Sequence, residues 1–84
     1  MTVARSSGPV RPDAGADLSG ERIKARRNEL GISQQALAAA TDVSRQTIIA
    51  MEQGNYAPSV FLALRVSVAL DVTVEDLWNS IRHQ

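Results

Sequence analysis

The side chains best suited to chemistry stand at the start of one short predicted helix, in the stretch TDVSRQTIIAMEQG. Ser44 is a favourable N-cap and Gly54 a favourable stop, which predicts a helix over residues 45–53. Its first turn carries three side chains with hydrogen-bonding groups: Arg45, Gln46 and Thr47. Arg bonds bidentately to the guanine O6/N7 edge, and Gln to the adenine N6/N7 edge. On an arbitrary helix such residues form an ordinary solvated face, so base-edge recognition depends on the element that positions this helix.

A second short helix is predicted directly before this one. Ser33 is its expected N-cap, and it covers residues 34–40 with Leu37 and Ala40 as inward positions. The turn over residues 41–43 separates the two helices, and this spacing matches a helix-turn-helix. In that motif the first residues of the second helix contact base edges in the major groove, while the first helix crosses the DNA backbone.

The remaining chain is also predicted to be helical, so the expected fold class is all-α with five short helices. Hydroxyl residues before apolar runs predict the other N-caps, at Ser19, Ser59 and Thr73. Gly31 is expected to end the first helix. The similar segments TDVS and LDVT predict two tight turns in which Asp42 and Asp71 adopt the left-handed conformation.

Each helix carries apolar residues at helical spacing. Those expected to face inward include Ile23, Leu30, Ile48 and Met51, with Arg27 on the same face as Ile23. The fourth helix is apolar at Val60, Leu62, Leu64, Val66 and Leu70, and the fifth at Val74, Leu77 and Trp78.

Length and composition indicate one small intracellular domain. The chain has 84 residues, no cysteine, and 9 basic against 9 acidic residues. Residues 1–18 are rich in Ser, Gly and Pro and are predicted to be a disordered tail, with the folded domain over residues 19–84. No apolar run approaches the ~20 residues of a membrane span, and no signal-peptide pattern opens the chain, so a cytoplasmic location is expected.

Several motifs together resemble the Cro/phage-repressor (XRE) helix-turn-helix family. They are GISQQALA, VSRQTI, MEQGNYAPS and the apolar pattern from Ala69 to Trp78, and the resemblance spans residues 20–78. It implies a λ-repressor-like domain that binds double-stranded DNA. Thr41 stands where the family usually has a large aliphatic residue, and Asp42 and Asp71 where it usually has Gly.

The resemblance also implies roles for individual residues. Base contacts are expected from Arg45, Gln46, Thr47, Ile49 and Ala50, where Ala50 replaces a side chain that is often longer. Contacts to the DNA backbone are expected from Ser33, Gln34, Ser44, Asn55 and Ser59. Arg27 and Glu52 match a pair that forms an internal ion pair in several members.

Three functions stay open at this point. The first is a sequence-specific regulator, expected to be a repressor that binds as a homodimer through Phe61, Val68 or Trp78. The second is an antitoxin-type module that also binds a partner protein, and the third is an adaptor that has lost DNA binding. An enzyme is not expected, because the single histidine, His83, stands next to the C-terminus. No cofactor or metal is expected either.

Overall fold

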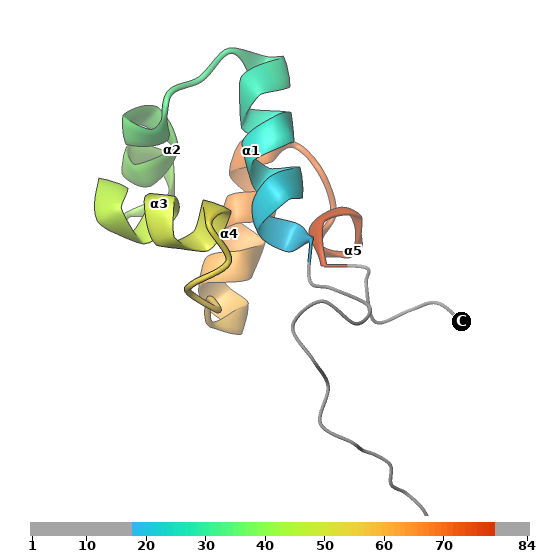
Figure 1. Ribbon diagram of the computed structural model, residues 1–84. Coiled ribbons are helices and arrows are strands. Elements are labelled where there is room, and N and C mark those ends of the chain that lie inside the picture. The colour runs from blue at the N-terminus through green and yellow to red at the C-terminus, as the bar shows by residue number, and fades with distance from the viewer. Residues whose placement is uncertain (1–17, 79–84) are drawn as a thin grey trace, which may run out of the picture.

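The computed structural model describes residues 18–78, and within them it contains five helices and no strand. The helices are α1 (Ser19–Leu30), α2 (Gln34–Thr41), α3 (Arg45–Glu52), α4 (Val60–Leu70) and α5 (Val74–Leu77). Figure 1 shows α2 and α3 together on one side of the molecule and α5 beside the start of α1. The predicted all-α class is confirmed. The predicted tail, apart from Leu18, lies outside the described residues.

Short polar side chains begin four of the five helices, as the sequence predicts. Ser33, Ser44 and Ser59 each accept a hydrogen bond from the backbone N–H three residues later. Thr73 does the same and forms a capping box, because the Asp76 side chain accepts from the Thr73 backbone N–H in return. Each cap satisfies one N–H group that has no partner inside its helix.

The first helix begins differently from the prediction. Ser19 is the first helical residue rather than the cap, and the N-cap position falls on Leu18, which makes no side-chain cap. The carbonyl of Leu18 accepts the first helical bond, from the Arg22 N–H at 2.9 Å. Ser19 is therefore buried in the helix, at 7% exposure, instead of standing at its solvent-facing end.

Left-handed residues end three of the helices. Gly31 has φ 72° after α1, while Asp42 and Asp71 have φ 62° and 57° after α2 and α4. Asp adopts this conformation more readily than most residues with a Cβ. The predicted tight turns are thus confirmed, with Asp in place of the family's usual Gly.

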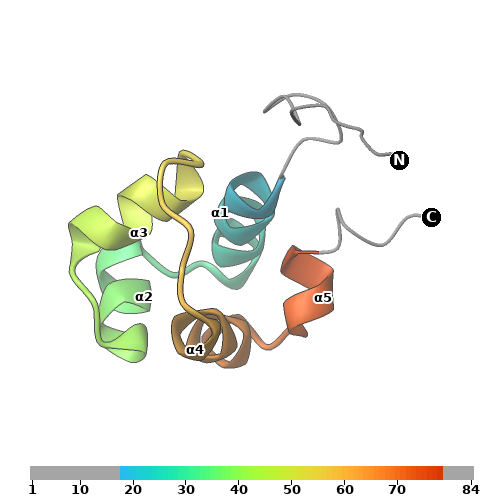
Figure 2. The same ribbon diagram turned by 90° about the horizontal axis from the view of Figure 1, so that it is seen from below.

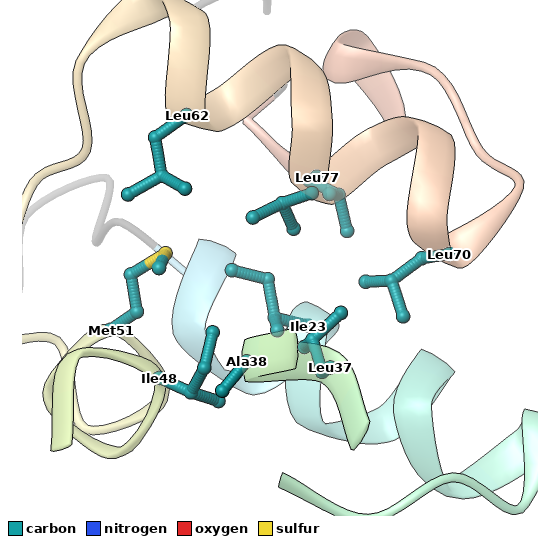
Figure 3. Close-up of a cluster of buried hydrophobic side chains, with 9 residues drawn as sticks. Ile23, Leu37, Ala38, Ile48, Met51, Leu62, Leu70 and Leu77 are labelled. Carbon is teal, nitrogen blue, oxygen red and sulfur yellow. The ribbon is translucent and has the colours of Figure 1, made fainter. Parts of the chain in front are cut away.

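The core lies between all five helices. Its buried apolar side chains are Ile23, Leu37, Ala38, Ile48, Met51, Leu62, Val66, Leu70 and Leu77. Figure 3 shows the labelled members converging on one centre from every helix. Figure 2 shows α1 and α4 between the α2–α3 pair and α5. The same core therefore packs against the α2–α3 pair and against α5. The close fit extends to backbone, since a Cβ on Gly20 would lie 2.5 Å from the Met51 carbonyl oxygen.

Some apolar positions are placed differently from the prediction. Leu30 is the last residue of α1 and is 40% exposed, outside the buried core. Ala40 is exposed and Ala38, two residues earlier, is buried, because α2 turns the face that carries Leu37 and Ala38 toward the core.

Thr41 fills a position where the family usually has a large aliphatic residue. It is fully buried at the end of α2, and its hydroxyl donates to the Leu37 carbonyl at 2.7 Å. The hydroxyl is therefore satisfied within its own helix, and a polar residue is accommodated beside the core without an unpaired donor.

Candidate functional site

The α2–turn–α3 unit has the geometry of a helix-turn-helix. Asp42 reverses the chain in the left-handed conformation, half-buried Val43 packs against the core, and Ser44 opens α3. Ile48 and Met51 anchor α3 in the core. This fixes the direction of α3 and leaves its first turn on the surface.

The first turn of α3 presents two free polar side chains. Arg45 and Gln46 are exposed, and neither forms a side-chain hydrogen bond or ion pair with the residues that the structure describes. Thr47 is half-buried, and its hydroxyl lies 3.1 Å from that of Ser44, where either can donate. One hydroxyl hydrogen of that pair remains available to an external acceptor.

The other arginines of residues 18–78 are used inside the fold. Arg22, Arg26 and Arg65 donate to the carbonyls of Leu77, Leu70 and Thr41, the last residues of α5, α4 and α2. Cations are favourable at these ends, where carbonyls lack helical partners. Arg22 and Arg26 thus join α1 to the C-terminal ends of α5 and α4.

Arg45 has the opposite placement. It is the first residue of α3, where the helix dipole disfavours a cation. The Arg45 side chain makes no hydrogen bond or ion pair with residues 18–78 that would stabilise the fold. A side chain that is exposed, unbonded and electrostatically misplaced for stability is suited to a negatively charged ligand.

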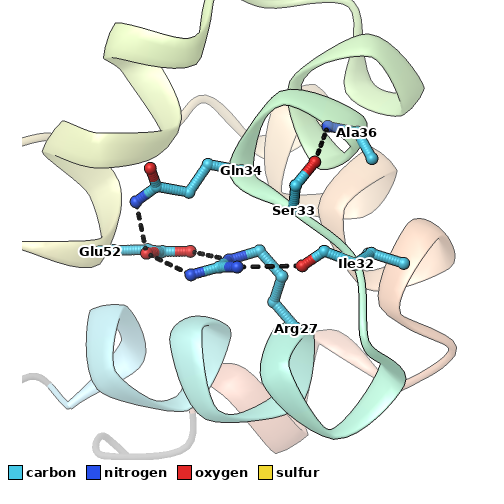
Figure 4. A network of polar contacts seen from close by, with 6 residues as sticks. All are labelled: Arg27, Ile32, Ser33, Gln34, Ala36 and Glu52. Atoms are coloured by element: carbon cyan, nitrogen blue, oxygen red, sulfur yellow. Dashed lines mark hydrogen bonds and ion pairs between the residues drawn. The ribbon is translucent and has the colours of Figure 1, made fainter.

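A buried polar network surrounds Glu52, the last residue of α3 (Figure 4). Arg27 Nε donates to Glu52 Oε2 at 2.7 Å, and the two side chains are 10% and 4% exposed. Arg27 Nη1 also donates to the Ile32 carbonyl at 2.9 Å, and Gln34 Nε2 donates to Glu52 Oε1 at 3.1 Å. The ion pair that the resemblance implies is therefore present, and it joins α1 to α3 and to the start of α2.

The helix N-termini also differ in charge. The first turns of α2, α3 and α4 carry no acidic residue, and all three are capped by a neutral serine. The first turn of α1 carries Glu21, and that of α5 carries Glu75 and Asp76. No acidic side chain in these first turns therefore compensates the partial positive charge at the N-termini of α2, α3 and α4.

Comparison with known proteins identifies the family of this chain. The helix-turn-helix family model matches residues 23–77. The chain belongs to the XRE-type helix-turn-helix family. An HTH-type transcriptional regulator of Methanothermobacter thermautotrophicus is 52% identical over 48 residues, which cover 57% of this chain and 70% of the relative. The regulator YgzD of Bacillus subtilis is 39% identical over 57 residues, covering 68% and 86%.

A solved structure supports the same assignment. The P22 c2 repressor in complex with a synthetic operator has a TM-score of 0.73 and 36% identity, covering 75% of this chain and 96% of that one. The family and fold of this XRE-type protein are those of DNA-binding transcriptional regulators rather than enzymes. No helix within residues 18–78 is long and apolar enough to cross a membrane.

The other predicted contact residues of this helix-turn-helix protein lie around the same helices. Ile49 and Ala50 are half-buried in α3, while Asn55 in the following loop and Ser59 at the start of α4 are exposed. The Asn55 backbone N–H donates to the Ala50 carbonyl at 2.8 Å, which ties the loop to the end of α3.

The predicted dimer residues fall into two groups. Phe61 and Val68 are 73% and 78% exposed on α4, beside exposed Leu64. Trp78 is instead half-buried and packs against the core. A shallow apolar hollow adjoins the exposed group, lined by Ala40, Leu64, Arg65, Val68 and Ala69.

Sequence reasoning did not anticipate four long-range hydrogen bonds. These are the bond from Gln34 to Glu52 and the arginine bonds to helix ends, whose partners lie 18 to 55 residues apart in the chain. No local pattern signals them. The only available hint is that Arg22 and Arg26 stand four residues apart on one helix and so share a face.

Proposed function

We propose that the protein is a sequence-specific transcriptional repressor that binds double-stranded DNA as a homodimer. The observation that carries this proposal is Arg45, exposed and unbonded in the first turn of α3, with Gln46 beside it. In a helix-turn-helix the N-terminal residues of the second helix contact base edges in the major groove. The exposed apolar surface of α4 supports the homodimer.

Base-edge contacts are assigned to the first turn of α3. Arg45 and Gln46 offer forked or paired groups that match guanine and adenine edges. Thr47 is held by Ser44 and contacts a phosphate or a thymine methyl group. Ile49 and Ala50 lie further along α3, and because the Ala50 side chain is short we expect a small base footprint.

Backbone contacts are assigned to the N-termini of α2, α3 and α4. Ser33, Ser44 and Ser59 accept from the backbone as caps, so a hydroxyl hydrogen can still be donated to a phosphate oxygen. Gln34 and Asn55 supply amide donors nearby. These contacts set the position of the protein on DNA but do not distinguish base pairs.

Selection of bound duplexes from a random DNA pool tests the DNA-binding part of the proposal. We expect enrichment of a near-palindrome with half-sites about 10 bp apart. Affinity for the enriched site should fall steeply with salt, because bound phosphates release counterions. A wild-type protein that enriches no sequence would overturn the regulator proposal and favour the adaptor.

The homodimer is assigned to the exposed apolar residues of α4. Val60, Leu64 and Val68 follow one another at four-residue spacing, so they form a stripe, with Phe61 beside it. Burying such a stripe against a second copy stabilises a dimer by roughly 25 cal/mol per Å² of apolar surface. A dimer also presents two reading helices to a palindromic site.

Sedimentation tests the dimer. We expect dimers of the wild type at high micromolar concentration and monomers of Val68→Lys. Leu30→Lys is the matched control, since Leu30 is also exposed near a helix C-terminus but lies on α1. A wild-type mass equal to one chain at that concentration would contradict the dimer.

A further inference from the structure

Two neighbouring glutamines in the first turn of α2 differ in how firmly they are held. Gln34 is half-buried and its Nε2 donates to Glu52 Oε1 at 3.1 Å, whereas Gln35 is exposed. The carboxylate of Glu52 already accepts from Arg27, and it accepts again from Gln34. The amide nitrogen of Gln34 must therefore face Glu52, and Figure 4 shows the amide oxygen turned away from it.

Glu52 is itself fixed by its other partner. Arg27 reaches both of its oxygens, at 2.7 Å from Nε and 3.3 Å from Nη2, and is held in turn by the Ile32 carbonyl. The opposite charges of this pair compensate each other. Glu52 can thus orient a neighbouring donor without presenting an unbalanced negative charge to DNA.

We propose that Glu52 is a positioning residue for DNA binding. It takes one of the two amide hydrogens of Gln34 and holds the side chain so that the second hydrogen donates to a DNA phosphate. A side chain that is already ordered loses less conformational entropy on binding than a free one. The proposal rests on the DNA-binding function proposed above, and it gives the buried pair a role beyond stability.

The variant Glu52→Gln disturbs this orientation in a defined way. Arg27 still requires an acceptor, so the new amide turns its oxygen toward Arg27 and its nitrogen toward Gln34. Two amide nitrogens cannot bond each other, so Gln34 must rotate and present its oxygen. The second hydrogen then leaves its place, and the phosphate contact is lost.

A double-mutant cycle on the full chain tests the proposal. Wild type, Glu52→Gln, Gln34→Met and the double variant are titrated with the enriched duplex at one fixed salt concentration, at a temperature where circular dichroism shows each to be folded. We expect Glu52→Gln to weaken binding about fivefold or more when Gln34 is present, and less than about twofold when Gln34 is Met. Equal losses in both backgrounds would show a merely structural role and overturn the proposal.

Two further variants make the result decisive. Gln35→Met is the matched control, and the effect of Glu52→Gln should be the same with or without it. If Glu52→Gln does not fold, Arg27→Met with Glu52→Met replaces it in the cycle, since an apolar pair strands no charge. A wild type that binds no duplex overturns the proposed function and this proposal together. A wild type that binds duplex DNA without coupling between positions 34 and 52 overturns this proposal alone.

Discussion

The helix N-termini of this protein are built in two ways. The starts of α1 and α5 carry acidic residues, and α5 adds a reciprocal capping box, so both satisfy their dipoles from within the chain. The starts of α2, α3 and α4 have neutral serine caps and no acidic residue, and α3 begins with an arginine. The three helices proposed to bind DNA, α2, α3 and α4, thus lack the acidic residue near the N-terminus that would stabilise each helix in the free protein.

The arginines repeat this contrast. Arg22, Arg26 and Arg65 donate to carbonyls at the C-terminal ends of other helices, where a cation stabilises the fold. Arg45 lies at the N-terminus of α3, where a cation does not. Residues that depart from the locally favourable choice are expected at functional sites. The comparison therefore separates residues that hold the domain together from residues kept for a ligand.

The largest expected effect concerns the buried pair, which belongs to the fold. Glu52→Ala should lower the free energy of unfolding by about 3 kcal/mol or more, because it strands the buried Arg27 charge. Urea denaturation measures the loss. Glu75→Ala, at an exposed position, is the control and should change stability far less. A loss below about 1 kcal/mol for Glu52→Ala would show that Arg27 finds another partner.

The next effect separates base contacts from backbone contacts. Gln46→Ala should weaken binding to the preferred site by about 1–3 kcal/mol and relax preference at one base pair of each half-site. Gln34→Ala should weaken binding to preferred and scrambled duplexes by similar factors, because phosphate contacts carry no sequence information. Both are titrated at one fixed salt concentration. Equal losses on both duplexes for Gln46→Ala would remove it from the base-contacting set.

The smallest expected effect comes from a comparison of two helix caps, Thr73 of α5 and Ser44 of α3. Thr73→Ala should lower stability by about 1 kcal/mol and leave DNA affinity unchanged, since α5 lies away from the reading helix. Ser44→Ala should cost a similar stability but also weaken DNA binding, because Ser44 holds Thr47 at the start of α3. Denaturation and titration of both variants check this. A change in DNA affinity for Thr73→Ala would contradict the separation of α5, which stabilises the fold, from the helices proposed to bind DNA.

The fold could be predicted where its signals are local. A serine or threonine accepts from an N–H three residues away, and an Asp in a tight turn depends on its own backbone, so the caps at Ser33, Ser44, Ser59 and Thr73 were readable from short segments. The start of α1 was not, because Ser19 is a buried first residue of the helix, and its burial depends on the whole domain rather than on a short segment.

The candidate site shows the same limit. Exposure of Arg45 and Gln46 follows from helical spacing around Ile48 and Met51, and it was predictable. The bond from Gln34 to Glu52 joins residues on different helices, so it depends on packing that spacing does not encode. The resemblance supplied the ion pair of Glu52 with Arg27 but not its second partner, Gln34.

The most direct test of the central claim is the substitution Arg45→Glu, measured for stability and for DNA binding together. A carboxylate in the first turn of α3 complements the helix dipole, so the free energy of unfolding should rise by about 0.3–1 kcal/mol. Affinity for the preferred duplex should fall at least about tenfold, because a base-edge donor is replaced by a charge that DNA repels. Opposite signs in the two measurements are the predicted result. An unchanged DNA affinity would contradict the assignment of α3 as the reading helix.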